Sequence, residues 1–244
     1  MDRDSQSFDA SERERLDLVA TRYDPSNPEE EFDFELKRIQ ARAIAPWLRG
    51  PAVLEMGCAT GELTSLLTRP DLAYEVVEGA EANIAAASAR SPSVVFHHSL
   101  WESFDPGSRF DDILLVCALE HVDDPVEILQ RARSWLAPGG RIHVVVPNAH
   151  SIHRLVGVEM GVLERCNALS DSDERIGHRR VYDIEGLSRD IVDADLQVLH
   201  WEGLFLKVLS NRQMIGWSQE LIAALARVAK HFPDSSAELY AIAS

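Results

Sequence analysis

The sequence predicts an α/β fold built on a mostly parallel sheet, and two patterns carry that prediction. From Val53 onwards, apolar runs of strand length alternate with longer stretches of helical periodicity. This alternation is typical of βαβ units, in which helices cover both faces of a parallel sheet. The first apolar run leads directly into the turn GCATG at residues 57–61. With 244 residues and 45% hydrophobic composition, the chain can bury one large core.

Two helices are predicted before the alternation begins. Residues 11–22 form the first, and the stretch YDPSNPEEEF that follows must be a loop. Residues 31–48 form the second, because apolar residues from Phe34 to Trp47 recur near helical spacing and Pro46 marks its end. We expect residues 1–48 to form a helical cap on a main domain at 49–244.

The alternating part of the chain gives its elements in order. The predicted strands are AVLEM (52–56), YEVVEGA (74–80), SVVFHH (93–98), DDILLVCA (111–118), RIHVVVP (141–147), LQVLHWEGLFLKV (196–208) and AELYAIA (237–243). The predicted helices lie at about 61–68, 82–89, 125–136, 184–193 and 216–229, and APGG (137–140) predicts a turn. Residues 148–182 break this rhythm with a polar stretch rich in His, Arg and Asp, which is typical of a functional insertion or lid.

The turn between Gly57 and Gly61 predicts a ligand site. A strand that runs straight into a helix leaves backbone N–H groups free at the helix start, and glycine lets a ligand approach them closely. Ligands of open α/β sheets bind at such carboxyl ends of strands. The turn lacks the G-x-G-x-x-G spacing of dinucleotide sites and the lysine of phosphate-binding loops. The expected ligand therefore carries no phosphate at this turn.

The turn resembles the E/D-x-G-x-x-x-G motif of class I S-adenosylmethionine-dependent methyltransferases of the small-molecule type. The resemblance runs from about Val53 to the end, through VVEGAEAN (76–83), FDDILLVCALEHVDDP (110–125), WLAPGGRIHVVVPNAHSIHRLVG (135–157) and GHRRVYDIEGL with GLFLKVLSNRQM. Five segments in order are far more specific than a lone G-x-x-x-G. The resemblance implies a Rossmann-like fold: a seven-stranded, mostly parallel sheet with an antiparallel last strand and an insertion after strand 5.

The resemblance also implies the cofactor, S-adenosylmethionine, with S-adenosylhomocysteine as product and no metal. Glu55 would hold its amino-acid end, and Glu81 matches the position of an acid that binds the ribose hydroxyls. Where the family frequently has an Asp for the adenine, this chain has Leu100 and Trp101, so we expect contact with the Trp101 ring. The candidate cofactor-binding residues are Glu55, Gly57, Cys58, Ala59, Gly61, Ala80, Glu81, Leu100, Trp101, Cys117 and Leu119.

Histidines and arginines of the later segments are candidates for the methyl acceptor. An alcohol acceptor needs a base near the methyl group, and His121 and His178 are the candidates, whereas an amine or carboxylate needs less help. The cluster His178, Arg179 and Arg180 suits a carboxylate or phosphate on the acceptor, unless the acids at 171–174 neutralise it. The candidate substrate-binding residues are Tyr23, Asn148, His153, Arg154, Arg179 and Tyr182.

Charge and cysteine content disfavour several classes of protein. The net charge of −16 repels nucleic acid and anionic membranes. Three cysteines, an odd number without paired spacing, disfavour a disulfide framework, and no His/Cys spacing indicates a metal site. No apolar run approaches the ~20 residues of a membrane span, and no leader pattern opens the chain. We expect a cytoplasmic protein, either a monomer or a homodimer.

The function predicted from these features is methyl transfer to an oxygen or nitrogen of a small molecule, with anionic, natural-product and sugar-type acceptors as the classes considered. Two other readings stay open. One is a non-catalytic module of the same fold that binds S-adenosylmethionine or a nucleoside. The other is a nucleotide-dependent oxidoreductase, which the missing G-x-G-x-x-G disfavours.

Overall fold

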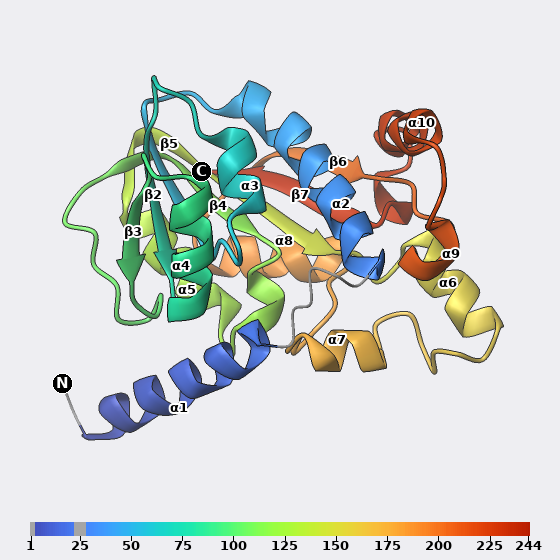
Figure 1. Cartoon of the computed structure of the whole chain (residues 1–244), viewed down its shortest axis with the longest axis horizontal. Helices are drawn as coiled ribbons and strands as arrows, with labels where there is room; N and C mark the ends of the chain where they lie inside the picture. Colours follow the sequence, from blue (N-terminus) through green and yellow to red (C-terminus); the bar gives the residue numbers. More distant parts are fainter. Residues whose placement is uncertain (1–2, 22–27) are drawn as a thin grey trace.

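The centre of the molecule is a seven-stranded sheet with strand order β3-β2-β1-β4-β5-β7-β6 (Figure 1). The computed structural model describes the backbone of residues 3–21 and 28–244, and the side chains of residues 11–21 and 32–244. The strands are β1 (Ala52–Met56), β2 (Ala73–Glu78), β3 (Val95–His98), β4 (Phe110–Val116), β5 (Leu136–Pro147), β6 (Val198–Leu204) and β7 (Glu238–Ala243). Strands β1 to β5 pair in parallel, and β7 runs antiparallel between β5 and β6. The predicted fold class, a mostly parallel sheet whose last strand is antiparallel, is confirmed.

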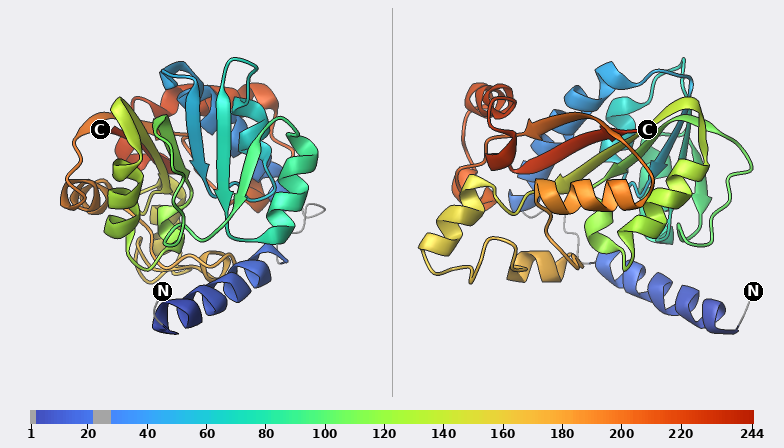
Figure 2. Two further views of the ribbon diagram at one scale, coloured as in Figure 1. Left: turned by 90° about the vertical axis from the view of Figure 1, so that its left-hand side faces the viewer. Right: turned by 180° about the vertical axis from the view of Figure 1, so that it is seen from behind.

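Helices cover both faces of the sheet, and each face has its own apolar cluster. Helices α5 (Pro125–Ser134) and α8 (Ile184–Asp193) pack on one face, and α2 (Pro28–Ile44), α3 (Glu62–Leu67), α4 (Glu81–Arg90) and α10 (Gln219–Ala229) contribute to the other (Figure 2). Strand β4 explains why apolar runs are continuous: Ile113 and Leu115 enter the first cluster, and Leu114 and Val116 enter the second. The core therefore fixes the strand ends that carry the site.

The remaining helices lie around the carboxyl edge of the parallel strands. Helix α1 (Arg3–Ala20) crosses beyond this edge, beside α7 (Asp171–Arg175) (Figure 1). The insertion also contains α6 (Ile152–Glu159), and α9 (Asn211–Met214) follows β6. Ser170 and Asp173 form a capping box at the start of α7, which explains why a helix begins within this polar stretch. Among the described residues, no helix combines the length and apolar character needed to span a membrane.

One expected turn belongs to a strand instead. The segment APGG, predicted as a turn, is the irregular first part of β5. The pairing of β4 with β5 jumps from Phe110↔Leu136 to Asp112↔Arg141, and Gly139 has a φ of +80°. The turn chemistry is therefore present, but the backbone forms a bulge within the ladder and does not leave it.

A buried polar chain joins three strands beneath this bulge. Asp112 of β4 lies 3.0 Å from His143 Nε2 on β5, and His143 Nδ1 lies 2.7 Å from the Tyr240 hydroxyl on β7. The second Asp112 oxygen accepts backbone N–H groups of Arg49 and Gly50 at 2.7 and 3.3 Å. Burial opposes the charge of Asp112, but these hydrogen bonds outweigh it and lower its pKa. The chain fixes the end of the N-terminal helical region against the sheet.

Candidate functional site

A cavity of about 480 Å³ lies at the carboxyl ends of β1, β2 and β4. The strand order reverses between β1 and β4, so this is the switch point at which open α/β sheets bind ligands. The cavity is lined by the turn after β1, the strand ends, one side of α1 and α2, and parts of the insertion. Its two ends differ in chemistry, and the turn after β1 builds the first of them.

The glycine turn has the backbone conformation that its sequence demands. Gly57 and Gly61 have φ values of +81° and +83°, and Ala59 between them has a φ of +46°. A Cβ on Gly57 would lie 2.7 Å from the Trp101 ring, and a Cβ on Gly61 would lie 2.7 Å from Cβ of Ala87 on α4. Both positions therefore require glycine, whereas the alanine between them is tolerated at a cost of about 1–2 kcal/mol.

Glu78, the last residue of β2, holds the turn from below. One of its carboxylate oxygens accepts the backbone N–H groups of Cys58 and Ala59 at 3.1 and 3.3 Å, and the other accepts that of Ala80 at 2.9 Å. Glu78 is buried and lines the cavity, but Glu81 is exposed and does not. The position expected for Glu81 is therefore corrected, because β2 ends three residues earlier than that assignment requires.

Other residues predicted for the cofactor divide into two groups. Glu55, Gly57, Cys58, Ala59, Leu100, Trp101 and Cys117 line the cavity. Gly61, Ala80 and Leu119 do not: Gly61 and Ala80 precede α3 and α4, and Leu119 is buried in the apolar cluster of α5 and α8. Glu55 is buried, and one of its oxygens accepts from Thr64 and Tyr74 at 2.7 and 2.9 Å. Burial raises the pKa of Glu55 to about 7.

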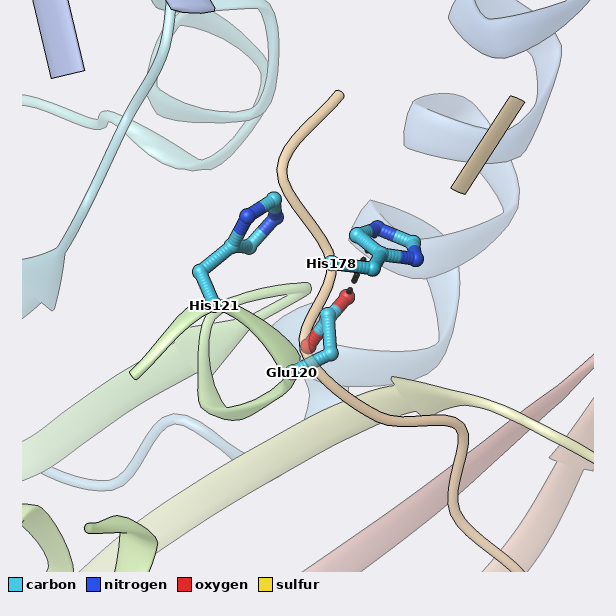
Figure 3. Close-up of side chains that lie close together, drawn as sticks. All are labelled: Glu120, His121 and His178. Carbon is cyan, nitrogen blue, oxygen red and sulfur yellow. Dashed lines mark ion pairs between the residues drawn. The ribbon is translucent and has the colours of Figure 1, made fainter. Parts of the chain in front are cut away.

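The second end of the cavity holds an acid and two histidines (Figure 3). Glu120 and His121 follow β4, and His178 follows α7. The rings of His121 and His178 lie 4.8 Å apart and nearly perpendicular. Nε2 of His178 lies 3.9 Å from Glu120 Oε1, and its Nδ1 lies 3.1 Å from Asp173 Oδ1. The two predicted histidines are thus brought together, with Glu120, which was not predicted.

The ionisation of this group follows from its burial. Both carboxylate oxygens of Glu120 are buried without a hydrogen-bond partner among the described residues. Burial raises the pKa of Glu120 to about 7. Burial, with His178 and Arg15 nearby, lowers the pKa of His121 to about 3, so His121 is a weak base. One ligand atom from each of the three residues lies within 4.8 Å of the others, so the group could also hold a divalent cation.

The arginines expected to bind an anionic acceptor are occupied within the protein. Arg154 is buried, pairs with Asp173 at 3.1 Å and donates to the carbonyls of Cys166 and Ala168. Arg179 pairs with Asp123 at 2.5 Å and donates to the His121 carbonyl. Arg180 also donates to carbonyl groups of the loop after β4, at residues 119–123. Arg154, which lines the cavity, thus holds the insertion together, whereas Arg179 and Arg180 fasten the insertion to the loop after β4.

The other predicted substrate residues have different positions. Asn148 and His153 line the cavity. The Tyr182 hydroxyl instead donates a hydrogen bond to the Asp190 carboxylate of α8 at 2.8 Å. Tyr23 lies outside the described residues. Two cavity-lining lysines, Lys37 and Lys207, were not predicted. Their only sequence signal is rarity, because the chain has three lysines among its 24 basic residues.

Comparisons with known proteins agree with this geometry. A family model described as a methyltransferase domain matches residues 22–201. The ubiquinone biosynthesis O-methyltransferase of Bradyrhizobium sp. (strain ORS 278) is 33% identical over 105 residues, which are 41% of this chain and 42% of that protein. The corresponding protein of Xanthomonas campestris pv. campestris (strain B100) is 29% identical over 156 residues, which are 59% and 64% of the two chains. The chain thus spans about two fifths of the first relative.

Solved structures resemble this protein over more of its length. The plantazolicin methyltransferase BpumL in complex with S-adenosylhomocysteine has a TM-score of 0.63 at 15% identity and covers 98% of this chain and 97% of its own. A methyltransferase from Mesorhizobium loti has a TM-score of 0.60 at 15% identity, with coverages of 84% and 95%. At these identities the likeness shows that the fold is shared.

Proposed function

The chain belongs to the methyltransferase-domain family, and on that premise we propose that it transfers the methyl group of S-adenosylmethionine to a hydroxyl oxygen of a small molecule. The curated relatives named above are O-methyltransferases, which supports the choice of oxygen. The fold supports the premise, because the cavity lies at the switch point of an open α/β sheet, which is where such sheets bind ligands.

The first end of the cavity fits the cofactor. Its turn offers close backbone approach without a phosphate-binding lysine, an acid ends β2, and the Trp101 ring forms one wall. Glu78 would bind the ribose hydroxyls, Trp101 would contact the adenine, and Glu55 with Lys37 would hold the amino-acid end. When bound, S-adenosylmethionine supplies a methyl group on a sulfonium, which is already an activated leaving group.

The carboxylate of Glu120, which accepts no hydrogen bond from the described residues, carries the proposal of oxygen transfer. A buried carboxylate without hydrogen bonds is costly, so a protein keeps one where a ligand completes it. With its pKa raised to about 7, Glu120 can accept a proton near neutral pH. As the acceptor oxygen bonds to the methyl carbon and the carbon–sulfur bond breaks, the hydroxyl proton passes to Glu120. His178, held by Asp173, stands beside the carboxylate and orients it.

The test is turnover of purified protein with S-adenosylmethionine and a panel of phenols, alcohols and amines, followed by release of S-adenosylhomocysteine. For a hydroxyl acceptor, kcat should rise with pH up to about 7 and then level, because the ionised carboxylate is required. Glu120→Gln should lower kcat by about 10²–10⁴-fold, and the exposed Glu185→Gln should not. Methylation of amines alone, at an unchanged rate in Glu120→Gln, would contradict oxygen transfer. Cofactor binding without any product would indicate a non-catalytic module.

A chelator separates two uses of the same cluster. A divalent cation on Glu120, His121 and His178 would lower the pKa of the acceptor hydroxyl, and Glu120 would then be a ligand instead of a proton acceptor. Unchanged turnover after dialysis against EDTA supports the proposed role of Glu120. If turnover is lost and Mg²⁺ or Zn²⁺ restores it, Glu120 binds a metal ion and does not act as the proton acceptor.

A further inference from the structure

Lysine is rare in this protein and is concentrated at the cavity. Of the three lysines, Lys37 and Lys207 line the cavity, and the exposed Lys230 follows α10. Neither cavity lysine forms an ion pair or side-chain hydrogen bond with another described residue. The acids around Lys37 raise its pKa, so the protein itself stabilises that ammonium group. Burial outweighs the charges around Lys207 and lowers its pKa, so Lys207, which lines the cavity without an ion pair or hydrogen bond among the described residues, is the candidate to bind an anion.

The two lysines differ in some of their charged neighbours. The charged groups that act on Lys37 include Glu55, which lies on β1 below the glycine turn. Those that act on Lys207 are Asp33, Glu238, Asp173 and Arg154, and neither Glu55 nor Glu78 is among them. Lys37 also acts on Glu120 and His121, so it lies between the two ends of the cavity, whereas the neighbours of Lys207 include Asp173 and Arg154 of the insertion.

His153 supplies a second hydrogen-bond donor beside Lys207. The backbone N–H of His153 donates to the Lys207 carbonyl at 3.2 Å, which places the two residues side by side. Nδ1 of His153 is buried without a hydrogen-bond partner among the described residues. Burial, together with Lys207 and Arg154, lowers the pKa of His153 to about 3. The ring is therefore neutral at pH 7 and can donate one N–H to an anion.

We propose that Lys207 and His153 form a subsite for a carboxylate group of the methyl acceptor. The inference rests on the proposed function and names the acceptor class for the same cavity. One ammonium and one imidazole N–H, from the segment after β6 and from α6, match the two oxygens of a carboxylate. The acceptor would carry this carboxylate together with the hydroxyl that faces Glu120.

The surrounding acids select a carboxylate over a phosphate. Asp33 accepts from Asn211 at 3.0 Å, and one oxygen of Glu238 accepts from Gln40 at 2.8 Å, whereas the other Glu238 oxygen is buried without a hydrogen-bond partner among the described residues. Their charges, with that of Asp173, still act on Lys207. They would oppose the second negative charge of a phosphate more than the single charge of a carboxylate.

The rarity of lysine gives a direct test. Protein labelled with ¹³Cε-lysine has three side-chain signals, which single Lys→Met variants assign. In the complex with saturating S-adenosylhomocysteine, the three isomeric hydroxybenzoates are the probes, with hydroxybenzamides and phenyl phosphate as controls. We expect the Lys207 signal to shift with at least one hydroxybenzoate, and not with its amide, while the Lys230 signal stays fixed. The Lys37 signal should shift when S-adenosylhomocysteine is added.

Calorimetry on the same complexes measures the size of the effect. Lys207→Met should weaken hydroxybenzoate binding about tenfold or more, Lys207→Arg should retain most of it, and neither should change S-adenosylhomocysteine affinity more than twofold. The inference would be overturned if no hydroxybenzoate shifts the Lys207 signal, or if phenyl phosphate binds more tightly than the hydroxybenzoates. Failure of S-adenosylhomocysteine itself to bind would instead overturn the proposed function, so the two failures are distinguishable.

Discussion

At the residue scale, two glutamates three positions apart differ because of where β2 ends. Glu78 is the last residue of the strand and lines the cavity, held by three backbone N–H groups. Glu81 begins α4 on the exposed side of the following turn. The carboxylate of Glu78 therefore belongs to the site, whereas that of Glu81 faces solvent.

This difference predicts the cofactor affinities of two matched variants. Glu78→Gln should weaken S-adenosylhomocysteine binding by roughly 1–3 kcal/mol, because a charged hydrogen-bonding group would be lost from the ribose and the turn. Glu81→Gln should leave the affinity within about 0.5 kcal/mol. Calorimetric titration of both variants checks this, and a larger loss in Glu81→Gln would restore the original assignment.

The raised pKa of Glu120 predicts that the ionised carboxylate needed for activity also lowers the stability of the folded protein. Its pKa is raised in the folded state to about 7, so the folded protein binds the proton more tightly than the unfolded chain does. Stability from this residue is therefore lost as pH rises from about 4.5 to 7. Glu120→Gln should raise the free energy of unfolding by roughly 1–3 kcal/mol at pH 8 and change it little near pH 4. Urea titrations at both pH values check this, and a variant that is less stable at pH 8 contradicts it.

At the scale of elements, the glycine turn is fixed by the packing of two helices. Gly61 precedes α3, and a Cβ there would lie 2.7 and 2.8 Å from Cβ and Cα of Ala87 on α4. The second glycine of the motif thus permits α3 and α4 to pack closely. Its role is structural in this protein, and it does not line the cavity.

A matched pair of glycines separates packing from backbone strain. Gly61 and Gly216 both have a φ of +83°, but a Cβ on Gly216 would meet no atom within 4 Å. Gly216→Ala should cost about 1–2 kcal/mol, which is the cost of the left-handed conformation. Gly61→Ala adds an overpacked contact and should cost roughly 2–4 kcal/mol. The urea midpoints of the two variants measure the difference, and equal midpoints would remove the packing role.

At the scale of the whole molecule, the two N-terminal helices differ in how much of the core they form. Ile39 and Ile44 of α2 are buried in the apolar cluster shared with α3 and α10, so α2 belongs to the core. Both helices also line the cavity, α2 with Lys37 and Gln40 and α1 with Arg15, Leu16 and Val19, and Gly177 of the insertion lies against α1. The cap at residues 1–48 and the closure of α1 over the cofactor both stay predictions.

Closure of α1 predicts protection from protease. Because α1 must open before it is cleaved, a ligand that it covers should slow trypsin cleavage at Arg13 and Arg15. At a hundredfold excess over Kd, S-adenosylhomocysteine would oppose opening by up to about 2.7 kcal/mol, which is roughly 100-fold in rate. Cleavage at the exposed Lys230, which does not line the cavity, is the internal control and should not change. Equal cleavage of α1 with and without the ligand would show that it does not close.

The sequence alone determined the fold class and most of the elements. Apolar runs bounded by turns predicted β1 at 52–56 and α8 at 184–193 with the boundaries that the structure has. These segments are specified locally, because a strand covered on both faces must be apolar throughout and α8 carries its own N-cap, Asp183. The glycine turn was also predictable, since its conformation requires residue types that can be read directly.

Only the tertiary structure decided how the charged residues of the site are used. The cationic cluster at 178–180 was read as an acceptor site, but its arginines reach carbonyl groups of the loop after β4. Lys207 and His153 are 54 positions apart and meet through one backbone hydrogen bond. Whether a charge is paired, buried or left open to a ligand depends on which distant segments pack around it. Local sequence does not encode those neighbours, so Glu78, Glu120 and Lys207 became visible only in the folded chain.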